Sequence, residues 1–311
     1  ADEVTATGTP GTNFSVVRLK RDILRRSAIG VMATGRSVDA RGNNANYAYG
    51  IDGTFGFFDN LTINTYWART ETDGLTANNT SYRAQVELND DRYGFEVDRL
   101  VIGDNFNPEI GFVRRDDIRR TFGEVRFSPR PAGLEAVRKL SWTASVNYIE
   151  NQAGVLETRE RLGAFGIDFE NSDTFTLTYT NSYEFLPASF KIARGVTLPV
   201  GGYDFDDVQV SYSLAQQRPV RAVLSVSRGS FYGGHKTAFG ATGGRVRVTN
   251  QLSLEPSYTW NDVRLAEGRF TNHLLSTRAT YTVSPWMFVS ALVQYQSNTN
   301  SVSTNARLRW E

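Results

Sequence analysis

The chain has 311 residues, no cysteine, two histidines and a formal net charge of +1 at pH 7. The absence of cysteine excludes disulfide-stapled folds, thiolate zinc sites, iron–sulfur clusters and thiol nucleophiles. An apolar fraction of 40% argues against disorder, and the near-neutral charge balance offers no general attraction for nucleic acid.

The hydrophobic pattern has a period of two residues. No apolar stretch approaches the ~18 residues of a membrane-spanning helix. Residues 1–4 lack the basic and apolar regions of a signal peptide, so we expect a mature chain or an excised piece of a longer one. In 81–89, by contrast, the even positions are apolar and the odd positions polar. Such alternation predicts strands with one apolar and one polar face.

The alternation predicts about sixteen strands. The expected strands are 26–36, 46–58, 61–70, 81–89, 92–102, 119–129, 139–150, 158–170, 173–184, 206–216, 219–228, 236–249, 251–262, 270–283, 286–296 and 301–311. Residues 12–22 resemble a seventeenth. These lengths suit the ~9–11 residues of a tilted membrane-crossing strand better than the ~5–6 of an average soluble strand. Aromatic residues near strand ends are typical of interfacial belts.

The connections alternate between two kinds. Short polar turns, as at 59–60, 89–91 and 171–172, alternate with longer polar or glycine-rich loops such as 71–80, 103–118 and 185–205. Outer-membrane barrels have this asymmetry, with tight periplasmic turns and long outer loops. A soluble β core and a propeller are the alternatives, but the sequence contains no repeated blade motif.

We therefore expect an all-β fold, a transmembrane antiparallel β-barrel with about 16–18 strands, as one domain over residues 1–311. Single-chain bacterial barrels have even strand numbers, so a strand at 12–22 leaves two interpretations open. Either residues 1–25 hold a periplasmic or luminal segment and sixteen strands close, or the chain is part of a larger barrel.

Four stretches carry a family resemblance: 13–36, 46–70, 81–131 and 287–311, with FNPEIGFVRR and NARLRWE the most specific motifs. They resemble an uncharacterised family of bacterial outer-membrane β-barrel domains. Its members usually follow a family-nine-like carbohydrate-binding module, which this sequence lacks, and similar proteins continue with strands beyond both ends of it. The resemblance implies location and fold, but no reaction.

Two charged clusters are candidate pore-lining sites. The loop 103–118 carries Arg114, Arg115, Asp116 and Asp117, which we expect to fold across the passage with Phe106, Ile110 and Phe112 as apolar anchors. Rings of charge of this kind set pore selectivity, although mixed charges in a surface loop also simply pair with one another. The second cluster is the polar face formed by Arg83, Glu87, Glu96, Asp98 and Arg99, with Arg126 farther along.

Enzyme chemistry finds little support. Neither His235 nor His273 lies in a recognisable motif, and the acidic pairs at 90–91, 116–117 and 206–207 suit turns or opposite strand faces. The sequence has no phosphate-binding glycine loop and no dinucleotide motif. We expect no enzyme, no catalytic residue, no cofactor and no metal site.

The sequence thus predicts an integral outer-membrane barrel of a Gram-negative bacterium that acts as a passage or transport channel. The alternative is a structural anchor for a carbohydrate-binding module or another partner, and a barrel-embedded hydrolase ranks third. Expected partners are outer-membrane lipid and either that module or other outer-membrane or periplasmic proteins, with no nucleic acid. Alternation also places Val86 toward lipid and Gln85 toward the lumen.

Overall fold

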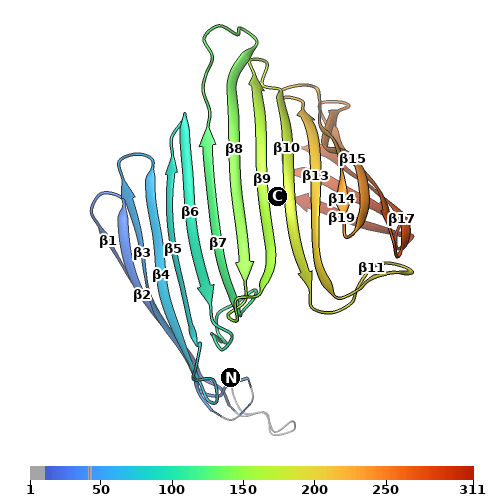
Figure 1. The fold of residues 1–311 in the computed structure, drawn as a ribbon. Helices are drawn as coiled ribbons and strands as arrows, with labels where there is room; N and C mark the ends of the chain where they lie inside the picture. Colours follow the sequence, from blue (N-terminus) through green and yellow to red (C-terminus); the bar gives the residue numbers. More distant parts are fainter. Residues whose placement is uncertain (1–10, 41, 43) are drawn as a thin grey trace. The chain divides into compact units, whose positions relative to one another are not determined.

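The computed structural model describes residues 11–40, 42 and 44–311, and every regular element in these residues is a strand. Seventeen of these strands form one large antiparallel sheet, and two short ones form a separate hairpin (Figure 1). Within the same residues, no helix is long and apolar enough to cross a membrane.

The strands follow one another closely along the chain. Their bounds are β1 (Phe14–Ile23), β2 (Ser27–Arg36), β3 (Asn46–Phe57), β4 (Leu61–Thr72), β5 (Thr80–Asn89), β6 (Tyr93–Ile102), β7 (Ile118–Phe127), β8 (Val137–Glu150), β9 (Leu156–Phe169), β10 (Thr174–Leu186), β11 (Phe190–Ala193), β12 (Val196–Leu198), β13 (Gly201–Ser213), β14 (Val220–Phe231), β15 (Gly234–Arg247), β16 (Leu252–Leu265), β17 (Gly268–Ser284), β18 (Met287–Gln296) and β19 (Ser301–Trp310). The predicted all-β antiparallel fold is confirmed.

The structure decides between the two interpretations of residues 12–22 and corrects one expected loop. The segment is the additional strand, because β1 pairs with β2 along its length, from Phe14 opposite Arg36 to Ile23 opposite Ser27. Residues 1–10 of the expected N-terminal segment lie outside the described residues. The expected loop 185–205 contains the hairpin β11–β12, and β13 already begins at Gly201.

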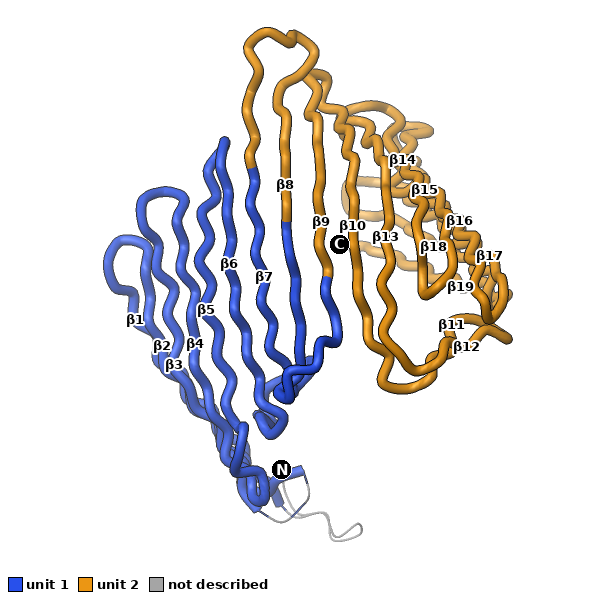
Figure 2. Tube along the Cα trace, in the orientation of Figure 1, with its two compact units in different colours: residues 1–126, 145–159 blue, residues 127–144, 160–311 orange. Residues whose placement is uncertain are grey.

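The chain divides into two compact units, coloured separately in Figure 2. In unit 1 (residues 1–126 and 145–159), β1 to β6 each pair with their neighbour in sequence. Cross-strand partners share a face of the sheet. One row of partners from β1 to β5 is Leu19, Val31, Ile51, Trp67 and Tyr82, and we call its side the apolar face. The next row is Lys20, Gly30, Asp52, Tyr66 and Arg83, and it lies on the opposite, polar face.

Unit 2 (residues 127–144 and 160–311) repeats this alternation. Across β10 and β13 to β16 an apolar row is Leu177, Val210, Val226, Phe239 and Trp260. The adjacent row on the opposite face is Thr178, Gln209, Ser227, Ala238 and Asn261. Each unit therefore separates apolar from polar side chains across the thickness of a single sheet.

Few residues of this sheet are buried in the ordinary sense. A core cluster of buried residues lies in unit 2, where Leu186, Leu198 and Tyr232 pack together. Partly buried neighbours in that cluster are Ile192, Tyr203, Phe205, Phe231 and Leu265. Phe205 lies four residues before Gln209 on β13, so its side chain is on the polar face. The hairpin β11–β12 therefore packs on the polar face of unit 2, because Leu198 of β12 belongs to the cluster that Phe205 contacts.

Candidate functional site

A buried carboxylate lies at the centre of the polar face in unit 1. Asp98 on β6 is 1% exposed and accepts hydrogen bonds from two arginines. Arg83 on β5 donates through Nε at 2.8 Å and Nη2 at 3.2 Å, and Arg120 on β7 donates through Nη1 at 3.1 Å. Arg120 also donates to Asn147 Oδ1 at 2.8 Å. Two guanidinium groups around one buried carboxylate satisfy its capacity to accept hydrogen bonds.

The predicted glutamates lie on the same face. The register places Glu87 directly opposite Glu96, and Gln85 opposite Asp98. Gln85 links Glu96 to Asn64 of β4, since its amide nitrogen donates to Glu96 at 2.6 Å and its oxygen accepts from Asn64 Nδ2 at 3.2 Å. The structure therefore brings together four of the five residues predicted for this cluster: Arg83, Glu87, Glu96 and Asp98.

Arg99 does not belong to this cluster, and that assignment was wrong. It pairs with Ala84, so it lies on the apolar face and donates to Thr121 of β7. Adjacent residues of a strand point to opposite faces, and Asp98 and Arg99 are adjacent. Arg126 lies on the polar face but at its short-turn end, where it donates to the carbonyls of Asp90 and Asp91.

The polar face holds a second ion pair that sequence reasoning missed. Arg18 on β1 forms a forked hydrogen bond to both carboxylate oxygens of Asp52 on β3, with Nη2 at 2.8 Å from Oδ1. The guanidinium crosses β2 at Gly30, where an added Cβ would lie only 2.5 Å from it. A glycine at this position therefore makes the pairing sterically feasible.

The loop 103–117, between β6 and β7, is held on this face by main-chain and side-chain bonds. The Asn107 amide donates to Thr70 Oγ1 at 3.0 Å, and its carbonyl accepts from Asn46 Nδ2 at 2.8 Å. The Glu109 side chain is 5% exposed, pairs with Arg36 at 3.1 Å and accepts from the main-chain amide of Ala40 at 3.0 Å. These bonds attach the loop to β2, β3 and β4.

The loop covers a cavity of about 400 Å³. Phe106, Pro108 and Gly111 form its loop side. Its sheet side includes Arg18, Thr34, Ala48, Gly50, Asp52, Tyr66 and Ala68, whose parity places them on the polar face. The loop therefore lies over the polar face. Of the expected anchors, Phe106 lines the cavity, whereas Phe112 is 86% exposed and is not an anchor.

The four charged residues at the end of this loop form a separate group. Arg114, Arg115 and Asp116 line a polar cavity of about 630 Å³ together with Arg36 and Glu109. Arg115 pairs with Glu157, and Asp117 accepts a hydrogen bond from the Gln152 amide at 2.9 Å. Asp117 has a φ of 51°, a conformation that aspartate tolerates better than most side chains. The structure thus ties this end of the loop to the segment 151–157.

Two groups outside the long strands have shifted pKa values. Asp173, in the turn before β10, is 2% exposed. Burial opposes its ionisation, but hydrogen bonds from the Ala215 amide, Tyr212 and Arg218 outweigh that effect and lower its pKa below 3.8. In unit 2, burial, reinforced by a hydrogen bond to Glu184, raises the pKa of Tyr232.

Metal and enzyme chemistry gain no positive support. Residues 11–311, apart from 41 and 43, contain no group of three or more histidines or acids that could hold a metal. The Tyr258 hydroxyl lies 3.0 Å from Nδ1 of His273, and His235 on β15 is the cross-strand partner of Arg264 on β16. No family model matches the chain, and no curated protein matches it.

Proposed function

We propose that this chain forms the wall of an integral outer-membrane β-barrel of a Gram-negative bacterium, that the polar face lines a passage, and that the chain belongs to the barrel-domain family it resembles. The observation that carries the proposal is the exposed apolar face. Leu19 and Ile51 are 65% and 58% exposed, and their row continues across the sheet. In water such a continuous apolar surface would be a liability, whereas acyl chains would cover it.

The strand lengths and turns support the same proposal. The strands of the large sheet have ten to seventeen residues, enough to cross a bilayer at a tilt. The short turns expose large apolar side chains, with Leu24 and Phe58 at 77% and 84% exposure. Apolar and aromatic residues at strand ends suit a membrane interface.

The polar face supports a passage. Its charges pair across strands, as in Arg83 with Asp98 and Arg18 with Asp52, and charged side chains of this kind need a wet environment. In each unit, the longest interstrand segment covers the polar face: the loop 103–117 in unit 1 and the hairpin β11–β12 in unit 2. Inward-folded loops narrow a passage and place charge where it selects ions.

The test is conductance in a planar lipid bilayer under a salt gradient. We expect the double reversal Arg114→Glu and Arg115→Glu to shift the reversal potential toward cation selectivity, because it replaces two positive charges beside the 630 Å³ cavity. Arg92→Glu, in a short turn, is the matched control and should leave selectivity unchanged. A membrane-inserted wild-type protein without conductance would contradict the passage and favour the alternative of a structural anchor.

A further inference from the structure

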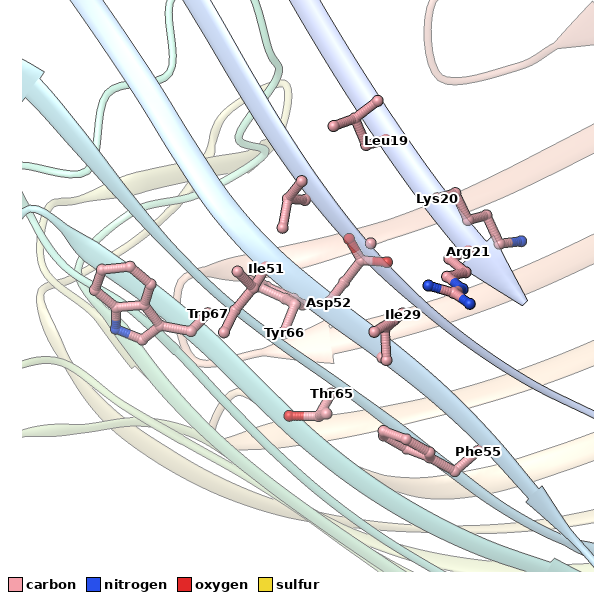
Figure 3. A pocket seen from close by; sticks show the side chains of 13 residues that line it. Leu19, Lys20, Arg21, Ile29, Ile51, Asp52, Phe55, Thr65, Tyr66 and Trp67 are labelled. Atoms are coloured by element: carbon pink, nitrogen blue, oxygen red, sulfur yellow. The ribbon is translucent and has the colours of Figure 1, made fainter. Parts of the chain in front are cut away.

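The apolar face of unit 1 carries a groove of about 520 Å³ formed by β1 to β4 (Figure 3). Its floor follows the register row Arg21, Ile29, Gly53 and Thr65, in which Gly53 and Thr65 are small. The neighbouring rows carry larger side chains. Leu19, Val31, Ile51 and Trp67 lie on one side, and Phe55 lies on the other with its ring over Gly53. The groove therefore deepens where the small side chains of Gly53 and Thr65 lie between rows of larger ones.

One end of the groove carries a positive charge. Arg21 lies two residues before the end of β1, next to the short turn 24–26, and its side chain is exposed. Within the described chain it makes no hydrogen bond or ion pair, unlike Arg18 on the other face. Arg25 in the adjacent turn is also exposed. A guanidinium beside an apolar groove matches a ligand with an anionic head and an apolar tail.

We propose that this groove binds an anionic glycerophospholipid, with one acyl chain along the row Ile29, Gly53 and Thr65 and the headgroup phosphate on Arg21. The inference rests on the proposed membrane location and adds a specific lipid site to it. Guanidinium groups bind phosphate oxygens through two parallel hydrogen bonds. The short-turn end is the periplasmic end of outer-membrane barrels, so the headgroup would lie in the inner leaflet. The groove volume lies within the ~300–1,000 Å³ range of small-molecule sites.

The experiment is native mass spectrometry of the full chain in a non-ionic detergent with equal amounts of phosphatidylglycerol and phosphatidylcholine. The wild type should retain phosphatidylglycerol in preference. Arg21→Gln should weaken that retention about tenfold, which corresponds to ~1.4 kcal/mol, and Arg21→Lys should keep most of it. Arg92→Gln removes a positive charge from another short turn, outside the groove, and is the matched control.

Several outcomes would overturn the lipid site. They are an unchanged preference in Arg21→Gln, an equal loss of retention in Arg92→Gln, or unchanged retention in Thr65→Phe, which fills the groove. Heat-modifiable migration on a denaturing gel is measured for every variant. If the wild type lacks it, the membrane location itself fails. If it is present without a preference for phosphatidylglycerol, only the lipid site fails.

Discussion

Introducing one charge on each face of the sheet measures what each face contacts. Ile51, on the apolar face, is 58% exposed and lies between Val31 and Trp67. In water, an arginine at such an exposed position would change the free energy of unfolding by less than ~0.5 kcal/mol. Facing lipid near the bilayer midplane, it would cost ~2–4 kcal/mol. Ile51→Arg therefore distinguishes the two environments by at least ~1.5 kcal/mol of unfolding free energy.

Gln85→Arg is the matched change on the polar face. The Gln85 amide already lies 2.6 Å from Glu96, and Asp98 stands directly opposite, so a guanidinium there meets carboxylates. We expect a change of less than ~0.5 kcal/mol, and for Val86→Arg, its neighbour on the apolar face, a cost of ~2–4 kcal/mol. The assay is urea unfolding from phospholipid vesicles, followed by tryptophan fluorescence. Equal, small effects for all three variants would refute the membrane-facing assignment.

Three further predictions concern the loop, a turn and a close approach. Glu109→Gln removes the ion pair with Arg36 that holds the loop 103–117. Trypsin should then cleave this loop faster while the unfolding midpoint changes little. An unchanged cleavage rate would show that the ion pair does not hold the loop. Asp173 has a lowered pKa in the folded protein, so its contribution to stability is present above the unfolded value of 3.8 and is lost as the pH falls through the lower, folded value. The urea concentration at the unfolding midpoint, measured between pH 6 and pH 2.5, should therefore decrease below about pH 4 in the wild type and not in Asp173→Asn. Identical pH profiles of the two proteins would contradict a stabilising role of ionised Asp173. Gly103→Ala places a Cβ against the main-chain carbonyl oxygen of Asn78 and should lower the free energy of unfolding by ~1–3 kcal/mol. Gly163→Ala has open space around its Cβ, and equal effects of the two substitutions would contradict the close approach at Gly103.

The strands and their facing could be predicted because they depend on local alternation alone. The segment expected at 81–89 forms β5 (Thr80–Asn89), and that expected at 301–311 forms β19 (Ser301–Trp310). A register slip by one residue would exchange the two faces, so the alternation fixes which residues share a face. The same rule places Arg99 on the opposite face of the sheet from Asp98. The prediction that grouped these two residues in one cluster did not apply the rule.

The rest depends on contacts between distant segments. The strands β11 and β12 have four and three residues, too few for a period to be recognised, and pack against aromatic residues from β13 and β14. The pairs Arg18–Asp52 and Arg36–Glu109 span 34 and 73 residues and need the register or the loop path to be known. The alternation of side chains along β1 and β3 places Arg18 and Asp52 on the polar face, but it does not show that they pair with each other.

The most direct measurement of the central claim uses the absence of cysteine from the sequence. Single cysteines at each position of 82–88 carry a nitroxide spin label in reconstituted vesicles. Accessibility to oxygen, which partitions into lipid, is compared with accessibility to a water-soluble nickel complex. The account predicts a period of two, with oxygen favoured at Tyr82, Ala84, Val86 and Leu88 and nickel favoured at the positions between them. Nickel access at all seven positions, or no alternation, would contradict a sheet with one face in the membrane.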